Sequence, residues 1–300
     1  MVAAPALWHD ANQRYLMAAV ASVRAKVDRG AGREDALGAE TAQAAVAAAA
    51  AELPAPASLD RLTTTLGLSD FERDLLLLCA GVELNSAFAD ALAGSAGNGR
   101  PYPTFGLALS LLPEAHWSAL SPGSPLRRWR LIEPAAGETL TESRLRLDEW
   151  VLHYLTGVPR LDARLESLLE PVVPPSAIAP THLARARRLA ESLVAAHDAL
   201  PPKVQLRGPE PAELRAVAAA ASASLGMVLY TLDAADVPAA ATEREALARL
   251  WEREAALGNA VLLVEVEDTE PSRPVRAFIE APAVRSWWRD ENRFRTCDVS

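Results

Sequence analysis

Residues 203–222, KVQLRGPEPAELRAVAAAAS, constrain the fold of this chain most strongly, because they have the strand, loop and helix order of a phosphate-binding loop. Aligned on the pattern G-x-x-x-x-G-K-[ST], Gly208 occupies the position of the first glycine. Glu213, Leu214 and Arg215 then replace the second glycine, the lysine and the hydroxyl residue. The stretch therefore predicts the outline of a phosphate-binding loop without its chemistry.

A working loop of this kind holds phosphates with backbone N–H groups, neutralises them with lysine and holds Mg²⁺ through a hydroxyl. Glu213 would instead place a carboxylate beside the phosphates, and like charges repel. We therefore expect no cofactor in this chain. The alternative is ATP with Mg²⁺, held through unconventional contacts that include Arg215.

The segments that follow also alternate between strand and helix patterns. Residues 228–233 and 260–266 predict strands, and residues 242–257 predict the helix between them. The continuous apolar run 260–266 is typical of a buried parallel strand. It resembles a Walker B strand in which Glu265 takes the aspartate position and Val266 the catalytic glutamate position. The competing interpretation is an ordinary α/β sheet with a polar strand end.

Length and charge limit the functional classes. A chain of 300 residues suggests about two domains. The net charge of −9 disfavours a broad surface for nucleic acid or anionic membranes. No apolar stretch reaches the ~18 residues of a membrane span, and the first residues lack the features of a signal peptide. We therefore expect a cytoplasmic protein that binds neither membrane nor nucleic acid.

The chain begins with a helical pattern over residues 8–28, in which apolar side chains recur along one stripe: Leu16, Val20, Val23 and Val27. An Ala-rich helix is expected over residues 34–53. Residues 1–53 thus predict a helical arm. It forms either an antiparallel hairpin or an arm that packs on another subunit.

Residues 54–170 combine helices with a hairpin pattern. Ser58 is expected to cap one helix, and Ser69 with Glu72 forms a capping box that opens a second, strongly apolar helix. Residues 103–112 predict a third helix, and the segment from Leu126 onward alternates as a β-hairpin. This order is typical of a winged-helix domain.

DNA recognition by such domains requires base-reading side chains on the recognition helix. The helix expected at residues 103–112 carries none of Arg, Lys, Asn or Gln, which favours protein contact over DNA binding. A basic group follows at Arg127, Arg128 and Arg130, which we interpret as a solvated strand edge.

Residues 161–169 predict a further helix, and residues 170–180, EPVVPPSAIAP, predict a Pro-rich linker. A helix is expected over residues 181–200. We therefore divide the chain into a helical arm (1–53), a winged-helix-like domain (54–170) and an incomplete α/β domain (171–300). The predicted fold class is a multidomain combination of α/β and α+β parts.

Several stretches resemble a family of bacterial AAA+ ATPases encoded with extracellular contractile injection systems. They are FERDLLLLCAGVEL (71–84), RPYPTFGLALSLLPEAHWSALSP (100–122), LRRWRLIE (126–133), LHYLTGVPRLD (152–162) and ALARLWEREAAL (246–257). The resemblance implies a degenerate AAA-type domain after the winged-helix-like domain. It also implies a hexameric ring, with the chain's own downstream AAA+ module or neighbouring subunits as partners.

The departures from that family predict a scaffold without hydrolysis. The lysine and hydroxyl residue are missing after Gly208, and AAA+ catalysis also needs an arginine finger. We interpret Arg289, Arg293 and Arg295 as surface arginines. A winged-helix transcription factor is a further alternative.

Other chemistries lack a pattern. The histidines form no metal-binding motif, so we expect neither a metal site nor catalytic residues. Cys79 and Cys297 predict no disulfide framework, and Cys79 fits a small core residue. Trp287 and Trp288 predict a packing anchor near the carboxyl end.

Overall fold

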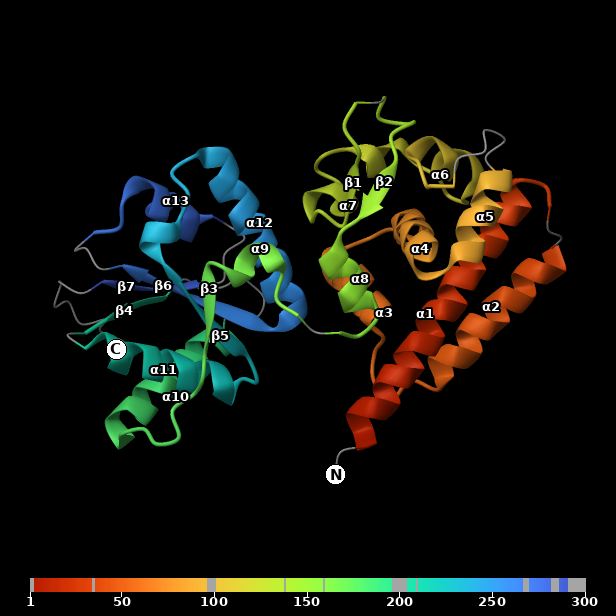
Figure 1. Ribbon diagram of the computed structural model, residues 1–300. Helices are drawn as coiled ribbons and strands as arrows, with labels where there is room; N and C mark the ends of the chain where they lie inside the picture. Colours follow the sequence, from red (N-terminus) through yellow and green to blue (C-terminus); the bar gives the residue numbers. More distant parts are fainter. Residues whose placement is uncertain are drawn as a thin grey trace. The chain divides into compact units, whose positions relative to one another are not determined.

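The computed structural model describes residues 3–33, 36–95, 101–137, 139–158, 160–195, 204–208, 210–266, 270–281 and 286–290. The chain divides into two compact units, Met1–Arg160 and Leu161–Ser300 (Figure 1). The first unit is largely helical, and the second is built around a sheet.

Two long helices, α1 (Ala3–Gly30) and α2 (Ala36–Ala51), lie side by side as a hairpin within the first unit (Figure 1). The predicted apolar stripe of α1 is buried, with Leu16, Val20, Val23 and Val27 at most 3% exposed. This stripe also packs on α4 (Asp70–Leu84), where a side chain at Gly81 would lie 3.1 Å from Val20. The hairpin therefore shares a core with the helices that follow it.

The remaining elements of the first unit are α3 (Ser58–Leu66), α5 (Ser86–Ser95), α6 (Phe105–Leu111), η1 (Trp117–Leu120), α7 (Pro125–Arg128), β1 (Ile132–Pro134), β2 (Leu145–Leu147) and α8 (Glu149–Leu155). The Ser69–Glu72 capping box of α4 is confirmed. The predicted cap at Ser58 is wrong, because Ala57 is the N-cap of α3. The Ser58 N–H instead donates to Oδ1 of Asn12 on α1, over 2.9 Å.

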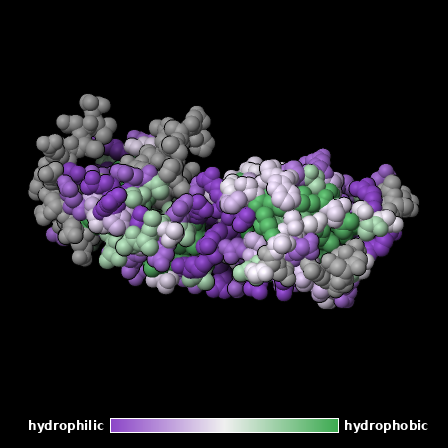
Figure 2. All heavy atoms as spheres, turned by 90° about the horizontal axis from the view of Figure 1, so that it is seen from above, coloured by the Kyte–Doolittle hydropathy of each residue, from purple (hydrophilic) through white to green (hydrophobic). Residues whose placement is uncertain are grey.

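Strands β1 and β2 form the predicted antiparallel hairpin, with Ile132 opposite Leu147. Thr104, the N-cap of α6, adds an isolated bridge to Arg144. The strand expected from Leu126 begins only at Ile132, because Pro125 opens α7 and Arg130 turns the chain with a φ of 54°. Hydrophobic residues gather on the face of the first unit seen in Figure 2.

The second unit contains α9 (Ala163–Glu166), β3 (Leu169–Val172), α10 (Pro180–Ala195), β4 (Val204–Arg207), α11 (Pro211–Ser224), β5 (Val228–Asp233), η2 (Ala234–Asp236), α12 (Ala241–Gly258), β6 (Ala260–Val266), α13 (Arg273–Glu280) and β7 (Ser286–Asp290). Its five strands have the order β3-β5-β6-β7-β4. Four are parallel, and β3 joins the β5 edge in antiparallel orientation. The predicted parallel sheet with β6 in its interior is confirmed.

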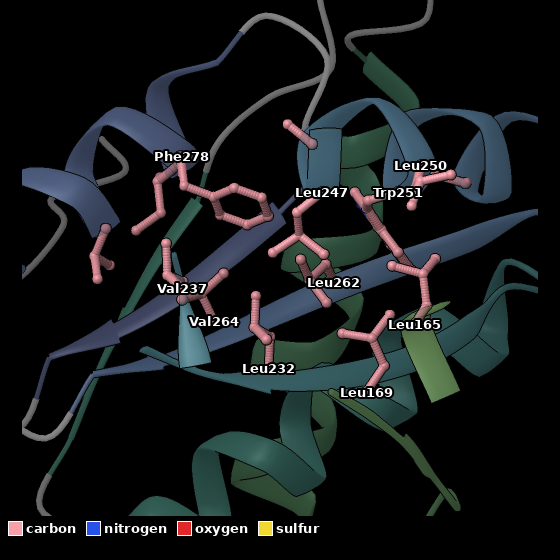
Figure 3. Packing of buried hydrophobic residues seen from close by; sticks show 14 of the residues in the cluster. Leu165, Leu169, Leu232, Val237, Leu247, Leu250, Trp251, Leu262, Val264 and Phe278 are labelled. Atoms are coloured by element: carbon pink, nitrogen blue, oxygen red, sulfur yellow. The ribbon is translucent and has the colours of Figure 1, made fainter. Parts of the chain in front are cut away.

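Helices cover both faces of this sheet. Successive side chains of β6 point to opposite faces and therefore contact different helices. Leu262 and Val264 pack under α12 and α13 with Trp251 and Phe278 (Figure 3). Val261 and Leu263 face α10 and α11 on the other side. A run with both faces covered is apolar throughout, which explains why β6 could be recognised in the sequence.

The segment that leads into the sheet differs from its prediction. Helix α9 ends at Glu166, and residues 169–172 form β3 rather than the end of a helix and the start of a linker. Leu165 and Leu169 both enter the core beneath α12 (Figure 3). Pairing with β5 also satisfies backbone groups of an otherwise open edge, so tertiary contacts decide the structure of this segment.

No single helix among the described residues has the length and hydropathy to cross a membrane. Helices α4 and α5 meet the criterion only as a pair bent by 118°. Ten residues of α4 are buried in the first unit.

Candidate functional site

The candidate nucleotide position lies at the carboxyl end of β4. Gly208 follows this strand, and α11 begins at Pro211. Strand β4 lies beside β7, but its crossover through α11 leads to β5, while α12 and α13 cross on the opposite face. Gly208 therefore lies at the topological switch point of the parallel strands, where open α/β sheets bind ligands.

The connection between β4 and α11 is short, and the side chain of Leu214 packs against it. Leu214 is 8% exposed, and a side chain at Gly208 would approach its Cδ2 to 3.1 Å. Helix α11 begins at Pro211, so Glu213, Leu214 and Arg215 lie in its first two turns. Leu214 thus supplies apolar packing against Gly208 at the position of the phosphate-binding lysine.

Arg215 and Glu265 form the dominant electrostatic contact of the site. Arg215 Nε donates to Glu265 Oε1 over 3.1 Å, and Nη2 donates to Oε2 over 2.6 Å. The Arg215 side chain is 44% exposed, and that of Glu265 is 15% exposed. The hydrogen bonds to Glu265 raise the pKa of Arg215 despite its partial burial, with the charges of Glu265 and Glu170 adding to the rise. The fork geometry makes this a strong, oriented pair.

Strand alternation explains why these two residues meet. Glu265 follows Val261 and Leu263 on the face covered by α11, whereas Val266 is buried on the opposite face. The Walker-B-like positions are therefore occupied by a carboxylate that faces a protein arginine and by a buried valine.

Glu213 is held toward α10 rather than toward the loop. Its Oε2 lies 3.4 Å from Nε2 of His182, and the contact is ionic when His182 is protonated. Of the predicted site residues, the structure thus joins Arg215 to Glu265 and Leu214 to Gly208. It brings Glu213 to a histidine instead.

The remaining sequence candidates contribute less to this site. Arg289, Trp287 and Trp288 lie on β7, a strand that was not predicted. Arg293, Arg295 and Cys297 lie outside the described residues. Cys79 is buried in α4, and burial raises the pKa of its thiol. Among the described residues, no group of three or more His, Cys, Asp and Glu side chains could hold a metal ion.

In the first unit, α7 is the helix directly before the hairpin, so the arginines after Leu126 do not lie on a strand edge as predicted. Arg127 Nη1 donates to the carbonyl of Leu120 over 2.8 Å. The guanidinium of Arg128 lies 4.9 Å from the ring centroid of Trp129, and Arg130 Nε lies 3.3 Å from Oε1 of Glu133. All three arginines therefore make contacts within the unit.

The order of helices and the hairpin agrees with a comparison to known protein families. The profile of a family described as "Winged helix domain, variant" matches residues 7–169. The chain belongs to this family. No curated protein and no solved structure matches the chain.

The variant winged helix domain includes the α1 hairpin, because Asn12 joins three of its segments. Asn12 is 1% exposed, donates from Nδ2 to the carbonyl of Leu155 over 3.0 Å, and accepts from the N–H of Ser58. It thereby ties α1 to the start of α3 and the end of α8. The matched residues continue past Arg160 into α9 and the first residue of β3.

Sequence reasoning missed a charged cluster in the second unit. Arg253 is completely buried and donates to Asp162, which also receives two side-chain hydrogen bonds from Arg164. Although burial alone would raise the pKa of Asp162, the bonds from Arg164 and the charge of Arg253 lower it. One signal was present, because Glu254 falls on the apolar stripe that contains Leu247 and Trp251.

Proposed function

We propose that this chain is a non-hydrolysing interaction and scaffold portion of an AAA+ ATPase of the kind encoded with contractile injection systems. The carrying observation is the Arg215–Glu265 pair, which joins the aligned hydroxyl position and the Walker-B-like position by an internal ion pair. The location of Gly208 at the switch point supports a degenerate AAA-type domain. The winged helix domain supplies a module for interaction.

Nucleotide binding would have to disrupt this arrangement. Phosphate at Arg215 would leave the carboxylate of Glu265, 15% exposed, without its cation. For a pair between the exposed and buried extremes, that loss costs on the order of 1–3 kcal/mol. The missing lysine charge at Leu214 adds to this cost. These terms favour a scaffold over an ATP-binding module.

The proposal predicts protein partners, namely a downstream AAA+ module or neighbouring subunits. The test is to read the coding region beyond residue 300, and to co-purify the chain with an AAA+ module encoded there or nearby. Co-elution at a fixed stoichiometry, with no phosphate release from ATP by the chain alone, is the expected result. Steady phosphate release by the purified chain that is abolished by Glu265→Gln would contradict the proposal.

A further inference from the structure

An open pocket of about 590 Å³ lies in the first unit, where the end of α3, the turn into α4, η1 and the start of α7 meet. Its polar lining includes Thr63, Ser69, Glu72, His116, Ser118 and Ser124, and no lysine or arginine is among its lining residues. The function proposed above assigns no role to this pocket.

Glu72 is a buried carboxylate without a cation. The residue is 3% exposed, and Oε2 accepts from the N–H and Oγ of Ser69 over 2.9 and 3.0 Å. Among the described residues, its Oε1 accepts no hydrogen bond and Glu72 takes part in no ion pair. The Ser69 bonds and the N-terminal end of α4 stabilise this charge, and Oε1 keeps its capacity to accept hydrogen bonds from a cationic guest in the pocket.

Two of the hydroxyl groups that line the pocket direct their protons into the protein. Thr63 Oγ1 donates to the carbonyl of Leu59, and Ser124 Oγ donates to that of Ala119, each over 2.7 Å. Their remaining capacity is to accept hydrogen bonds. The pocket thus combines a carboxylate with acceptor oxygens, which suits a guest that carries a positive charge and only donors. A guanidinium has these properties, with five N–H donors in a planar fork.

His116 gives the pocket a fixed wall. Its Nε2 lies 3.0 Å from Ser69 Oγ and its Nδ1 lies 2.8 Å from Ser118 Oγ, while its ring stands edge-on to Phe71. Between His116 and Ser118 in the chain, Trp117 is 64% exposed. Exposed tryptophans and arginines are enriched among the residues that dominate protein interfaces.

We propose that this pocket binds an arginine side chain of a partner protein. The guanidinium lies on Glu72, and Trp117 contacts the partner at the rim. This inference rests on the proposed function as an interaction module, and it names the partner's chemistry. The nucleotide and co-purification tests report on the proposed function separately, so failure of arginine binding would leave those results intact.

Two matched probes are titrated separately into the full chain. Their binding is detected by NMR through the tryptophan indole and histidine ring signals. N-acetyl-arginine methylamide carries the guanidinium, and the citrulline analogue replaces it with a neutral urea of the same shape. We expect saturable shifts of Trp117 and His116 with the arginine probe, with a Kd in the millimolar range for so small a ligand. The citrulline probe should bind more weakly than the arginine probe, by about tenfold or more, because the charge-assisted hydrogen bond is lost.

The matched variant is Glu72→Gln. Glutamine preserves the capping box, so α4 stays formed while the charge is removed. We expect the variant to lose about tenfold in affinity for the arginine probe and none for the citrulline probe. Equal binding of the two probes, an unchanged affinity in Glu72→Gln, or no shift of Trp117 or His116 up to about 0.1 M arginine probe would each overturn the proposal.

Discussion

Arg253 on α12 donates from Nη2 to Oδ2 of Asp162 over 2.5 Å, joining residues 91 positions apart through a side chain that is completely buried. Neutralising Asp162 removes one charged partner of the buried guanidinium, and losing a partner from a buried pair is strongly destabilising. Asp162→Asn should therefore destabilise the second unit by about 3–5 kcal/mol. Urea denaturation, monitored by hydrogen exchange of peptides from α12 and β6, measures this loss of stability.

The control for that variant is Arg164→Gln, because the Arg164 side chain is 40% exposed and binds the same carboxylate. Its loss should cost about 1 kcal/mol or less. Similar losses in the two variants would show that burial of Arg253 does not set the energetics of this cluster.

Glu254 should make the stability of the second unit fall as pH rises. Burial raises its pKa to about 7 from 4.5, with the charge of Asp162 adding to the rise and that of Arg253 opposing it. Between these values the folded state binds more protons than the unfolded state, so the free energy of unfolding decreases with pH. The decrease amounts to roughly 3 kcal/mol at most.

Hydrogen exchange of α12 peptides at about pH 5 and pH 8, corrected for the intrinsic rate, measures this dependence. Glu254→Gln should flatten the profile and leave the variant more stable than the wild type at the higher pH. An unchanged slope in the variant would assign the dependence to another group.

Asn12 should contribute to the winged helix domain out of proportion to its size. Asn12→Leu would leave the Leu155 carbonyl and the Ser58 N–H without their partner, at about 1–3 kcal/mol for each buried group. The control is Gln13→Ala on the exposed side of α1, expected within about 0.5 kcal/mol of the wild type. Thermal unfolding of both variants compares them. A loss in Asn12→Leu no larger than in the control would refute the three-way connection.

The winged helix domain should show no sequence-specific binding to duplex DNA. Helix α7 has only four residues, and Arg127, Arg128 and Arg130 make contacts within the unit. We expect equal fluorescence anisotropy for unrelated labelled duplexes at moderate salt, with no change in Arg128→Gln. A preference for one duplex that disappears in Arg128→Gln would establish base reading by α7.

The parts of the fold that follow from local sequence were predictable. The apolar run of β6 and the Ser69–Glu72 capping box carry their own signals, and both are present. Strand β3 was missed because its structure depends on pairing with β5, which local propensity does not encode. The Asp162–Arg253 pair was missed because the two residues meet only after the sheet has formed.

At the candidate site, alignment with the phosphate-binding and Walker B patterns identified Gly208, Arg215 and Glu265. It did not predict that Arg215 and Glu265 contact each other. That Arg215 faces Glu265 follows from the alternation of β6 and the placement of α11 on one face of the sheet. Both depend on the crossover direction. Sequence alone therefore left Arg215 open to phosphate, whereas the structure commits it to a carboxylate.

We propose that the Arg215–Glu265 pair and Leu214 prevent nucleotide binding, and calorimetric titration with Mg·ATP tests this most directly. The account predicts no saturable heat, or a Kd weaker than about 1 mM, for the wild type and for Arg215→Ala alike. In a control variant, Gly, Lys and Thr replace Glu213, Leu214 and Arg215. This variant tests whether restoring these three consensus residues alone is enough to bind nucleotide. A micromolar Kd in the wild type that is abolished by Arg215→Ala would contradict the account.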